Sequence, residues 1–403
     1  MKNERILISG AGIAGQTVAY WLARHGFRPT IVERAAQLSR GGQGVDIRGQ
    51  AIAVAERIDI MARARASAMR TAGLHYVDAA GREIARVDMR RIQEKYDTAD
   101  VEIMRGDLVH ILHDVTSGQV EYLFGDSITA LDQDTDGVTV TFDRSPARRF
   151  DLVIGADGLH STVRRLAFGP EREFVHHMRH YFAFSDADPR LGDNGWMTMF
   201  NTPGQMAGIY NSATSPEAKA YFIFRSPELD IDHRDPESVR AVPTKQYAPE
   251  TAWHVPQLLA AALADPDLYF DALAQVHLPT WSTDRIALVG DAAYCASPAS
   301  GAGAELSLLG AYHLAGALAA ANGNHNTAYP HYEQALRPLV TTKQKIGPNL
   351  RLMVPKSRLG ITLRNTMTRL PLLVPLAGME RIMSPKSTPP LPHYPHPTPT
   401  RCP

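Results

Sequence analysis

Near its N-terminus the chain reads Ile6-Leu7-Ile8-Ser9-Gly10-Ala11-Gly12-Ile13-Ala14-Gly15. The first four residues form a short apolar run that a glycine ends, which is typical of a buried parallel strand. The glycine loop leads into an apolar helical stretch that Gly26 ends. A second strand, residues 30–32, finishes at Glu33. This order of strand, glycine loop, helix, strand and acid predicts a Rossmann-like βαβ unit, and hence an α/β fold.

The glycine loop in this setting predicts a dinucleotide site. Gly10 allows the tight turn, Gly12 lets the backbone approach a pyrophosphate, and Gly15 lets helix and strand pack closely. Free N–H groups from Ala11 onward lie at the positive end of the helix dipole. They are expected to hold the phosphates.

Three charged side chains are expected around the dinucleotide. Glu33 lies about 18 residues beyond Gly15, which suits a hydrogen bond to a ribose hydroxyl. Because its carboxylate would repel a 2′-phosphate, the sequence favours FAD or NAD over NADP as the bound dinucleotide. Arg34 adjoins Glu33 and is expected to contact the adenosine half. Arg105 begins a predicted helix, and its guanidinium suits phosphate or ribose oxygens.

Two later segments repeat the pattern of a buried strand that ends in a polar turn. The first reads Asp151-Leu152-Val153-Ile154-Gly155-Ala156-Asp157-Gly158, with Ser161 and Arg164 behind it. The second reads Arg285-Ile286-Ala287-Leu288-Val289-Gly290-Asp291-Ala292-Ala293, followed by Pro298, Gly301, Gly303 and Ala304. Ligands bind at the carboxyl ends of strands in open α/β sheets, so both turns are candidate ligand loops. The plain alternative for Asp157 is a local turn cap.

In this order and at these separations, the three motifs resemble the FAD-binding frame of the single-component (group A) flavin monooxygenases. That family includes p-hydroxybenzoate hydroxylase and the tetracycline-inactivating monooxygenases. The resemblance spans most of residues 1–345. It identifies Asp157-Gly158 with the DG motif, which contacts FAD and takes part in NAD(P)H use, and Gly290-Asp291 with the GD motif. It implies that Asp291 binds the ribityl chain and that backbone N–H groups of residues 298–303, before Ala304, approach the isoalloxazine ring.

A second resemblance concerns the connector after the first βαβ unit. Gly41-Gly42 with Asp46 is similar to the ring-proximal loop of the tetracycline-inactivating branch, so Gly44 and Asp46 are expected near the flavin. Two positions depart from the family pattern. Tyr294 stands where His is common, and Glu305 stands where Asn or Thr is common. Both departures bear on the flavin environment or on the choice of substrate.

The resemblance implies an enzyme that binds FAD, consumes NADPH or NADH, and inserts one oxygen atom of O2 through a flavin C4a-hydroperoxide. Hydroxylation, epoxidation and Baeyer–Villiger oxidation remain open. So do two alternative functions, a flavin-dependent reductase of the same fold (isoprenoid type) and a non-catalytic FAD-bound binding protein. The Trp-x-Trp-x-Ile-Pro signature of a flavin halogenase is absent from the sequence.

The stretch from about residue 172 to 281 alternates short apolar strands with turns, which predicts an inserted antiparallel sheet over the flavin face. Apolar aromatic and flexible Met side chains suit a bulky, hydrophobic aromatic or polycyclic substrate: a phenol, an aromatic polyketide or a tetracycline-like antibiotic. The predicted lining residues are Met197, Met199, Met206, Phe222 and Phe224. No general base can be assigned from the sequence. The catalytic candidates are Arg48, expected near the ring, and Tyr210 and His180, proposed by chemistry alone.

The predicted domains follow from these segments. Residues 1–171 and 282–340 form a discontinuous FAD-binding domain, with a hairpin near 72–90 that could join the substrate side. Residues 172–281 form the substrate-binding domain. Residues 341–383 predict a long helical bridge across both domains, and the Pro-rich tail 384–403 is expected to be disordered.

Composition bears on possible partners, metal sites, disulfides and membrane segments. Acidic and basic residues balance at 42 each, which gives no sign of a nucleic-acid partner. Two cysteines do not make a disulfide framework, and His176, His177 and His180 lack a metal-binding pattern, so no metal is expected. No apolar run reaches the ~18 residues of a membrane span, and no signal peptide is visible. We expect a cytoplasmic protein, either a monomer or a homodimer.

Overall fold

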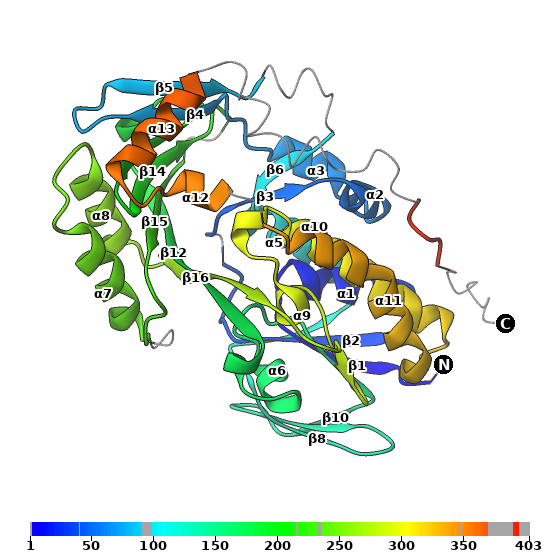
Figure 1. The fold of residues 1–403 in the computed structure, drawn as a ribbon. Coiled ribbons are helices and arrows are strands. Elements are labelled where there is room, and N and C mark those ends of the chain that lie inside the picture. The colour runs from blue at the N-terminus through cyan, green and yellow to red at the C-terminus, as the bar shows by residue number, and fades with distance from the viewer. Residues whose placement is uncertain are drawn as a thin grey trace.

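The computed structural model describes residues 2–39, 41–90, 99–214, 217–231, 235–346, 349–369 and 390–394. Its elements form two bodies that lie side by side (Figure 1). One is built on a mainly parallel six-stranded sheet, and the other on a mainly antiparallel seven-stranded sheet. The predicted α/β class, with a Rossmann-like domain and a second sheet domain, is confirmed.

The body with the parallel sheet contains β1 (Arg5–Ser9), α1 (Ile13–Arg24), β2 (Arg28–Glu33), β3 (Gly44–Ile47), α2 (Gln50–Arg57), α3 (Met61–Ala66), β6 (Val101–Met104), α5 (Arg105–Thr116), β7 (Glu121–Phe124), β8 (Ile128–Gln133), β9 (Val138–Phe142), β10 (Arg148–Phe150), β11 (Leu152–Gly155), α6 (Thr162–Ala167), η1 (Glu171–Glu173), β17 (Ser282–Thr283), β18 (Ile286–Leu288), α9 (Asp291–Tyr294), η3 (Pro298–Ser300), α10 (Gly303–Ala320) and α11 (His325–Lys343).

The other body contains β4 (Gly73–Val77), β5 (Glu83–Asp88), β12 (Val175–Ala187), η2 (Pro189–Leu191), β13 (Trp196–Thr202), β14 (Gln205–Asn211), β15 (Ala218–Arg225), α7 (Pro236–Tyr247), α8 (Val255–Ala264), β16 (Tyr269–Val276), α12 (Asn349–Met353) and α13 (Arg358–Arg369).

The parallel sheet has the strand order β17-β18-β11-β1-β2-β7, with only β17 antiparallel to its neighbour. The chain begins in the middle at β1, moves to β2 on one side, and later places β11 on the other. A switch of direction of this kind leaves a crevice at the carboxyl ends of the central strands. Ile6, Leu7 and Ile8 are fully buried, as expected for an apolar strand covered on both faces.

The seven-stranded sheet has the order β16-β12-β15-β14-β13-β4-β5. Its core is the inserted sheet that the sequence predicts. The hairpin of β4 and β5, about 85 residues upstream of β12 in the chain, adds to its edge through a parallel pairing of β4 with β13. The hairpin that the sequence left open thus belongs to this sheet.

The two faces of the seven-stranded sheet have different neighbours. The outer face packs on α7 and α8 through Ala183, Phe200 and Phe222, among others. The inner face carries Phe182, Met199 and other apolar side chains, and Ala299 of η3 packs against it. The inner face is therefore the one that meets the parallel-sheet body.

In the described part of the predicted bridge of residues 341–383, the chain is helical but is divided between the end of α11, α12 and α13; residues 347–348 and 370–383 lie outside the described residues. Helix α11 packs on α10, and α10 packs on α1, as Figure 1 shows. The short helix α12 contributes Leu350 and Met353 to the inner-face cluster. Pro355 lies between α12 and α13, where its ring would interrupt a continuous helix. Helix α13 then lies against β5 and β13.

Part of the predicted disordered tail is packed. Residues 390–394 run along α10, and the Tyr394 ring covers Gly316, where any side chain would collide with it. The Tyr394 hydroxyl bonds to His313 Nδ1 at 3.0 Å, and the Tyr312 hydroxyl donates to the Pro392 carbonyl at 2.6 Å. Burial of aromatic surface holds this short segment in place despite its proline content. The rest of residues 384–403 lies outside the described residues.

Candidate active site

Four loops meet at the carboxyl edge of the parallel sheet. They follow β1 at Gly10, β2 at Glu33, β11 at Ala156 and β18 at Gly290. All three sequence motifs are therefore brought to one crevice, as the topology requires.

The glycine loop is tightly packed on one side and open on the other. A Cβ at Gly15 would lie 2.0 Å from the Gly10 carbonyl oxygen, so only glycine allows this approach of α1 to β1. Among the described residues, the one neighbour of a Cβ at Gly12 within 4 Å is Arg105 Nη2, at 3.7 Å. The open space between the N-terminus of α1 and the Arg105 guanidinium fits an anionic pyrophosphate.

Glu33 ends β2 beside the glycine loop. One carboxylate oxygen accepts from the Ala11 N–H and the other from the Ala35 N–H, both at 2.8 Å. These bonds fix its position at the edge where the adenosine ribose of a dinucleotide would lie. Arg34 is exposed beside it. The ribose and adenosine roles of Glu33 and Arg34 stay predictions.

The loop after β11 is organised by its own acid. Asp157 accepts bonds from the Ser161 hydroxyl and from the Val163 N–H. Burial raises the pKa of Asp157, and the Ser161 bond opposes that rise. The carboxylate thus folds the loop, whereas Gly158, with a φ of +79°, faces open space. Contacts of this loop to a cofactor would come from its backbone.

Arg164 ties this loop to the loop after β18. Its guanidinium is completely buried and donates to the Ala292 carbonyl at 3.0 Å and to the Leu159 carbonyl at 2.6 Å. It also forms an ion pair with Glu171 at 3.4 Å. The two loops are therefore held in fixed relation by one side chain.

The loop after β18 forms a second open cradle. Asp291 lies in the first turn of α9; burial raises the pKa of its carboxyl, and Cys295 and Arg105 oppose the rise. Pro298 begins η3, and Gly301 follows in a left-handed conformation with a φ of +58°. Among the residues that the structure describes, no heavy atom lies within 4 Å of a Cβ at Gly303, where the long helix α10 begins, and the next residue, Ala304, is buried. This backbone, with the N-terminus of α10, fits the pyrimidine side of a flavin ring.

A charged cluster flanks that cradle. Arg48 Nε donates to Glu305 Oε2 at 3.2 Å, and its Nη2 donates to the Ser300 carbonyl at 3.0 Å. Asp46 lies 3.9 Å from Arg48 Nη1. Gly44 starts the same strand as Asp46, and a Cβ there would lie 3.0 Å from Glu102 Oε1. The structure thus brings Arg48 and Asp46 together beside the loop that follows β18, and their roles toward a flavin stay predictions.

The predicted substrate-lining residues divide between the two faces of the sheet. Met197, Met199 and Met206 belong to the inner-face cluster, although Met199 and Met206 are almost fully buried there. Phe222 and Phe224 lie on the outer face under α7 and α8, so the expectation that they line the flavin side is wrong. Side chains alternate along a strand, and the phase of β15 puts Tyr221 and Ile223 on the inner face instead.

The catalytic candidates are also separated. Burial raises the pKa of the Tyr210 phenol well above its usual range, and the carboxylates of Glu102 and Asp46 reinforce the rise. Tyr210 shares the inner face of β14 with Met206, since side chains alternate along a strand. His180 is buried beside Arg225 and bonds to the Met178 carbonyl at 2.8 Å. Burial lowers the pKa of His180.

A network that the sequence reading did not identify joins the two bodies. His160, in the loop after β11, bonds through Nε2 to Asp271 at 3.1 Å and through Nδ1 to Glu171 at 2.9 Å. The Tyr269 hydroxyl donates to the other Asp271 oxygen at 3.1 Å. The spacing of Tyr269 and Asp271 could have indicated part of this network, because residues two apart on a strand lie on the same face, here the inner face of β16. Its partner His160 is not marked by any pattern.

This network predicts a pH dependence of stability. Burial disfavours the charged form of His160, but the bonds to Asp271 and Glu171 outweigh burial and raise its pKa from 6.5 to about 10. The stabilisation is therefore fully present below pH 6.5 and is lost as pH rises toward about 10. We expect the free energy of unfolding to fall more steeply over that range in the wild type than in His160→Gln. Denaturant titrations at several pH values would measure both slopes, and equal slopes would contradict a stabilising role of the His160 network.

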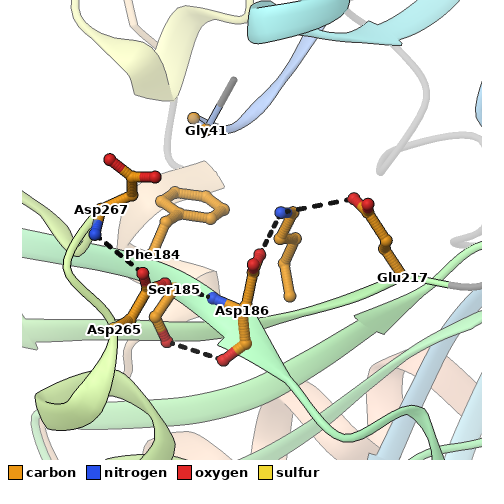
Figure 2. Close-up of a pocket in the computed structure, with 9 residues that line it drawn as sticks. Gly41, Phe184, Ser185, Asp186, Glu217, Asp265 and Asp267 are labelled. Carbon is orange, nitrogen blue, oxygen red and sulfur yellow. Dashed lines mark hydrogen bonds and ion pairs between the residues drawn. The ribbon is translucent and has the colours of Figure 1, made fainter. Parts of the chain in front are cut away.

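A pocket of about 260 Å³ opens beside the cradle, between the glycine-rich connector and the ends of β12 and β15 (Figure 2). Lys219 is nearly buried at its wall and pairs with Asp186, while Glu217 lies 3.7 Å from its Nζ. The lining residues are Gly41, Gly42, Phe184, Ser185, Asp186, Glu217, Lys219, Asp265 and Asp267. None of these residues belongs to the ring cradle. The pocket is a separate polar cavity, and Gly42 in its wall lies against Arg105.

In the part of the chain that the structure describes, no group of three or more His, Cys, Asp or Glu side chains is arranged to hold a metal ion. Within the same residues, no helix combines the length and apolar character needed to cross a membrane.

Comparison with known proteins agrees with this geometry. Residues 4–340 match the family model described as an FAD binding domain. A flavin-dependent monooxygenase of Legionella longbeachae is 38% identical over 351 residues, which cover 86% of this chain and 88% of that protein. An uncharacterized protein of Mycobacterium tuberculosis is 43% identical over 342 residues, covering 85% and 92%.

Among solved structures, the crystal structure of the tetracycline destructase Tet(51) superposes with a TM-score of 0.81 at 33% identity, covering 98% of this chain and all of the other. Because the FAD-binding family model covers most of the chain, FAD is the bound cofactor, with NAD(P)H as the reductant typical of the family. The chain belongs to the FAD-binding-domain family and, within it, to the flavin-dependent monooxygenases.

Proposed function

We propose that this monooxygenase inserts one oxygen atom of O2 into a bulky, hydrophobic aromatic or polycyclic substrate of the phenol, aromatic polyketide or tetracycline-like class. The observation that carries the proposal is the composition of the inner face opposite the ring cradle. Met197, Tyr210, Tyr221 and Tyr269 are all partly exposed on that side of the sheet. Flat aromatic rings with a flexible thioether suit a planar, apolar ligand. The likeness to a tetracycline destructase over nearly the whole chain supports the same class.

In this proposal the bound FAD supplies the hydride-accepting and O2-activating chemistry. The protein supplies binding and orientation. The glycine loop and Arg105 would hold the pyrophosphate, and the backbone of residues 301–303 at the start of α10 would hold the ring. The inner face of the sheet excludes water from the ring and orients the substrate. Arg48 fixes the Ser300 carbonyl, which keeps the loop of the ring cradle in shape.

The substrate class is tested by following NADPH oxidation and product mass with a panel of simple phenols, aromatic polyketides and tetracyclines. We expect the polycyclic compounds to accelerate NADPH oxidation most and to yield a product heavier by one oxygen atom. Faster oxidation that yields only hydrogen peroxide would mean that these compounds are not substrates. Turnover restricted to small phenols would overturn the polycyclic part of the proposal.

A further inference from the structure

Four charged side chains gather beside the ring cradle. Glu305, with 6% of its side chain exposed, accepts from Arg48 Nε at 3.2 Å and from Lys343 Nζ at 2.7 Å. Arg48 and Lys343 are themselves largely buried, at 16% and 18% exposure. Asp46 completes the cluster at 3.9 Å from Arg48. Two carboxylates and two cations make this cluster neutral as a whole.

The cluster touches the backbone that faces the flavin. A Cβ at Gly301 would lie 3.5 Å from Asp46 Oδ2 and 3.6 Å from Arg48 Nη1. Arg48 also donates to the Ser300 carbonyl. Glu305 is in the first turn of α10, two residues after the open position at Gly303. Lys343, the last residue of α11, extends its side chain to Glu305.

At this position the charges act on the energy of reducing the flavin. Charges in a poorly hydrated site act over several ångströms because solvent does not screen them well. The flavin ring gains negative charge when NAD(P)H reduces it. A cation held at the cradle favours that change, and a carboxylate held there opposes it.

We propose that Glu305 and Lys343 set the reduction potential of the bound flavin in opposite directions, with Glu305 lowering it and Lys343 raising it. The inference rests on FAD binding at this cradle, but not on the identity of the substrate. Glu305 and Lys343 act through the electrostatic field, so they are tuning residues rather than catalytic ones. Their balance fixes how readily the enzyme is reduced.

The competing interpretation is a structural tie between α10 and α11. Both interpretations predict that removing Glu305 destabilises the fold, because two largely buried cations lose their partner. Only the tuning role predicts a change of potential whose sign follows the charge. The reduction potential therefore separates the two.

The test measures the flavin potential of FAD-loaded protein by equilibration with a dye of known potential. Glu305→Gln is expected to raise it by at least about 30 mV, a tenfold change in a two-electron equilibrium constant. Lys343→Gln is expected to lower it by a similar amount. The double variant restores neutrality and is expected to return within about threefold of the wild-type constant.

Glu121→Gln is the matched control. It removes one carboxylate that pairs with Arg148 at the opposite, amino-terminal edge of the parallel sheet, so the potential should not move. If Glu305→Gln does not fold, Lys343→Gln decides alone. Potentials that stay unchanged, or that move in the same direction in both single variants, would overturn the proposal. If the variants change the flavin potential as expected but the wild type oxygenates no test compound, the proposed substrate class is refuted and this inference stands.

Discussion

Gly12→Asp is expected to abolish the retention of FAD while leaving the apoprotein folded. In the part of the chain that the structure describes, a Cβ at this position has Arg105 Nη2, at 3.7 Å, as its nearest neighbour, so the fold tolerates the new side chain. Gly12 is the N-cap of α1 with a φ of −77°, where Asp is a favoured residue. The carboxylate, however, would stand in the space for the pyrophosphate and repel it. We expect at least a hundredfold loss of FAD affinity, roughly 2.8 kcal/mol.

The same substitution should stabilise the apoprotein by a few tenths of a kcal/mol, because Asp caps the helix better than Gly. The measurements are the flavin content of purified protein, FAD titration of the apoprotein, and its thermal unfolding. Gly118→Asp is the control, since Gly118 is exposed and no described residue lies within 4 Å of a Cβ there. If Gly12→Asp retains FAD as tightly as this control, the assigned position of the pyrophosphate is incorrect.

Arg164→Leu is expected to cost about 3–5 kcal/mol of folding free energy, the range for breaking a buried ion pair. The guanidinium is fully buried between the loops after β11 and β18, and burial lowers its pKa against the opposing effect of Glu171. Its loss would leave the Ala292 and Leu159 carbonyls without their donor. Leucine fills part of the volume, so the loss of polar contacts dominates.

Denaturant unfolding of apoprotein and FAD-loaded protein would measure this loss. The exposed neighbour Arg165 provides the control, and Arg165→Leu should change stability by less than about 0.5 kcal/mol. Because Arg164 links two cofactor loops, FAD affinity should fall as well in Arg164→Leu. A variant with wild-type stability would show that the two loops are held by other contacts.

The cofactor half of the molecule was predictable because its signals are local. Each motif is a buried strand followed by a constrained turn, and parallel strands bring such turns to one edge wherever they fall in the chain. The tight Gly10–Gly15 contact and the open Gly12 follow directly from that pattern. Glu305 was visible as a departure from the family pattern.

The features that the sequence did not predict depend on which face of a strand each side chain occupies and on partners that lie far away in the chain. Strand β15 is buried on both faces, so alternation could not tell which of Tyr221 and Phe222 faces the flavin. The partners of Glu305 come from 257 residues upstream and 38 residues downstream, and no local rule pairs them. The packing of Tyr394 on Gly316 likewise depends on a tertiary contact that overrides the composition of the tail.

The most direct test of the central claim is a reaction with isotopically heavy O2, in which visible flavin absorbance and product mass are followed together. We expect purified protein to carry oxidised FAD and NADPH to bleach it. We also expect one polycyclic or aromatic compound to leave the reaction with a single heavy oxygen atom. A flavin that NADPH reduces but that never transfers labelled oxygen to any aromatic or polycyclic compound would contradict the proposed oxygenation. A protein that binds no FAD after reconstitution would contradict the site itself.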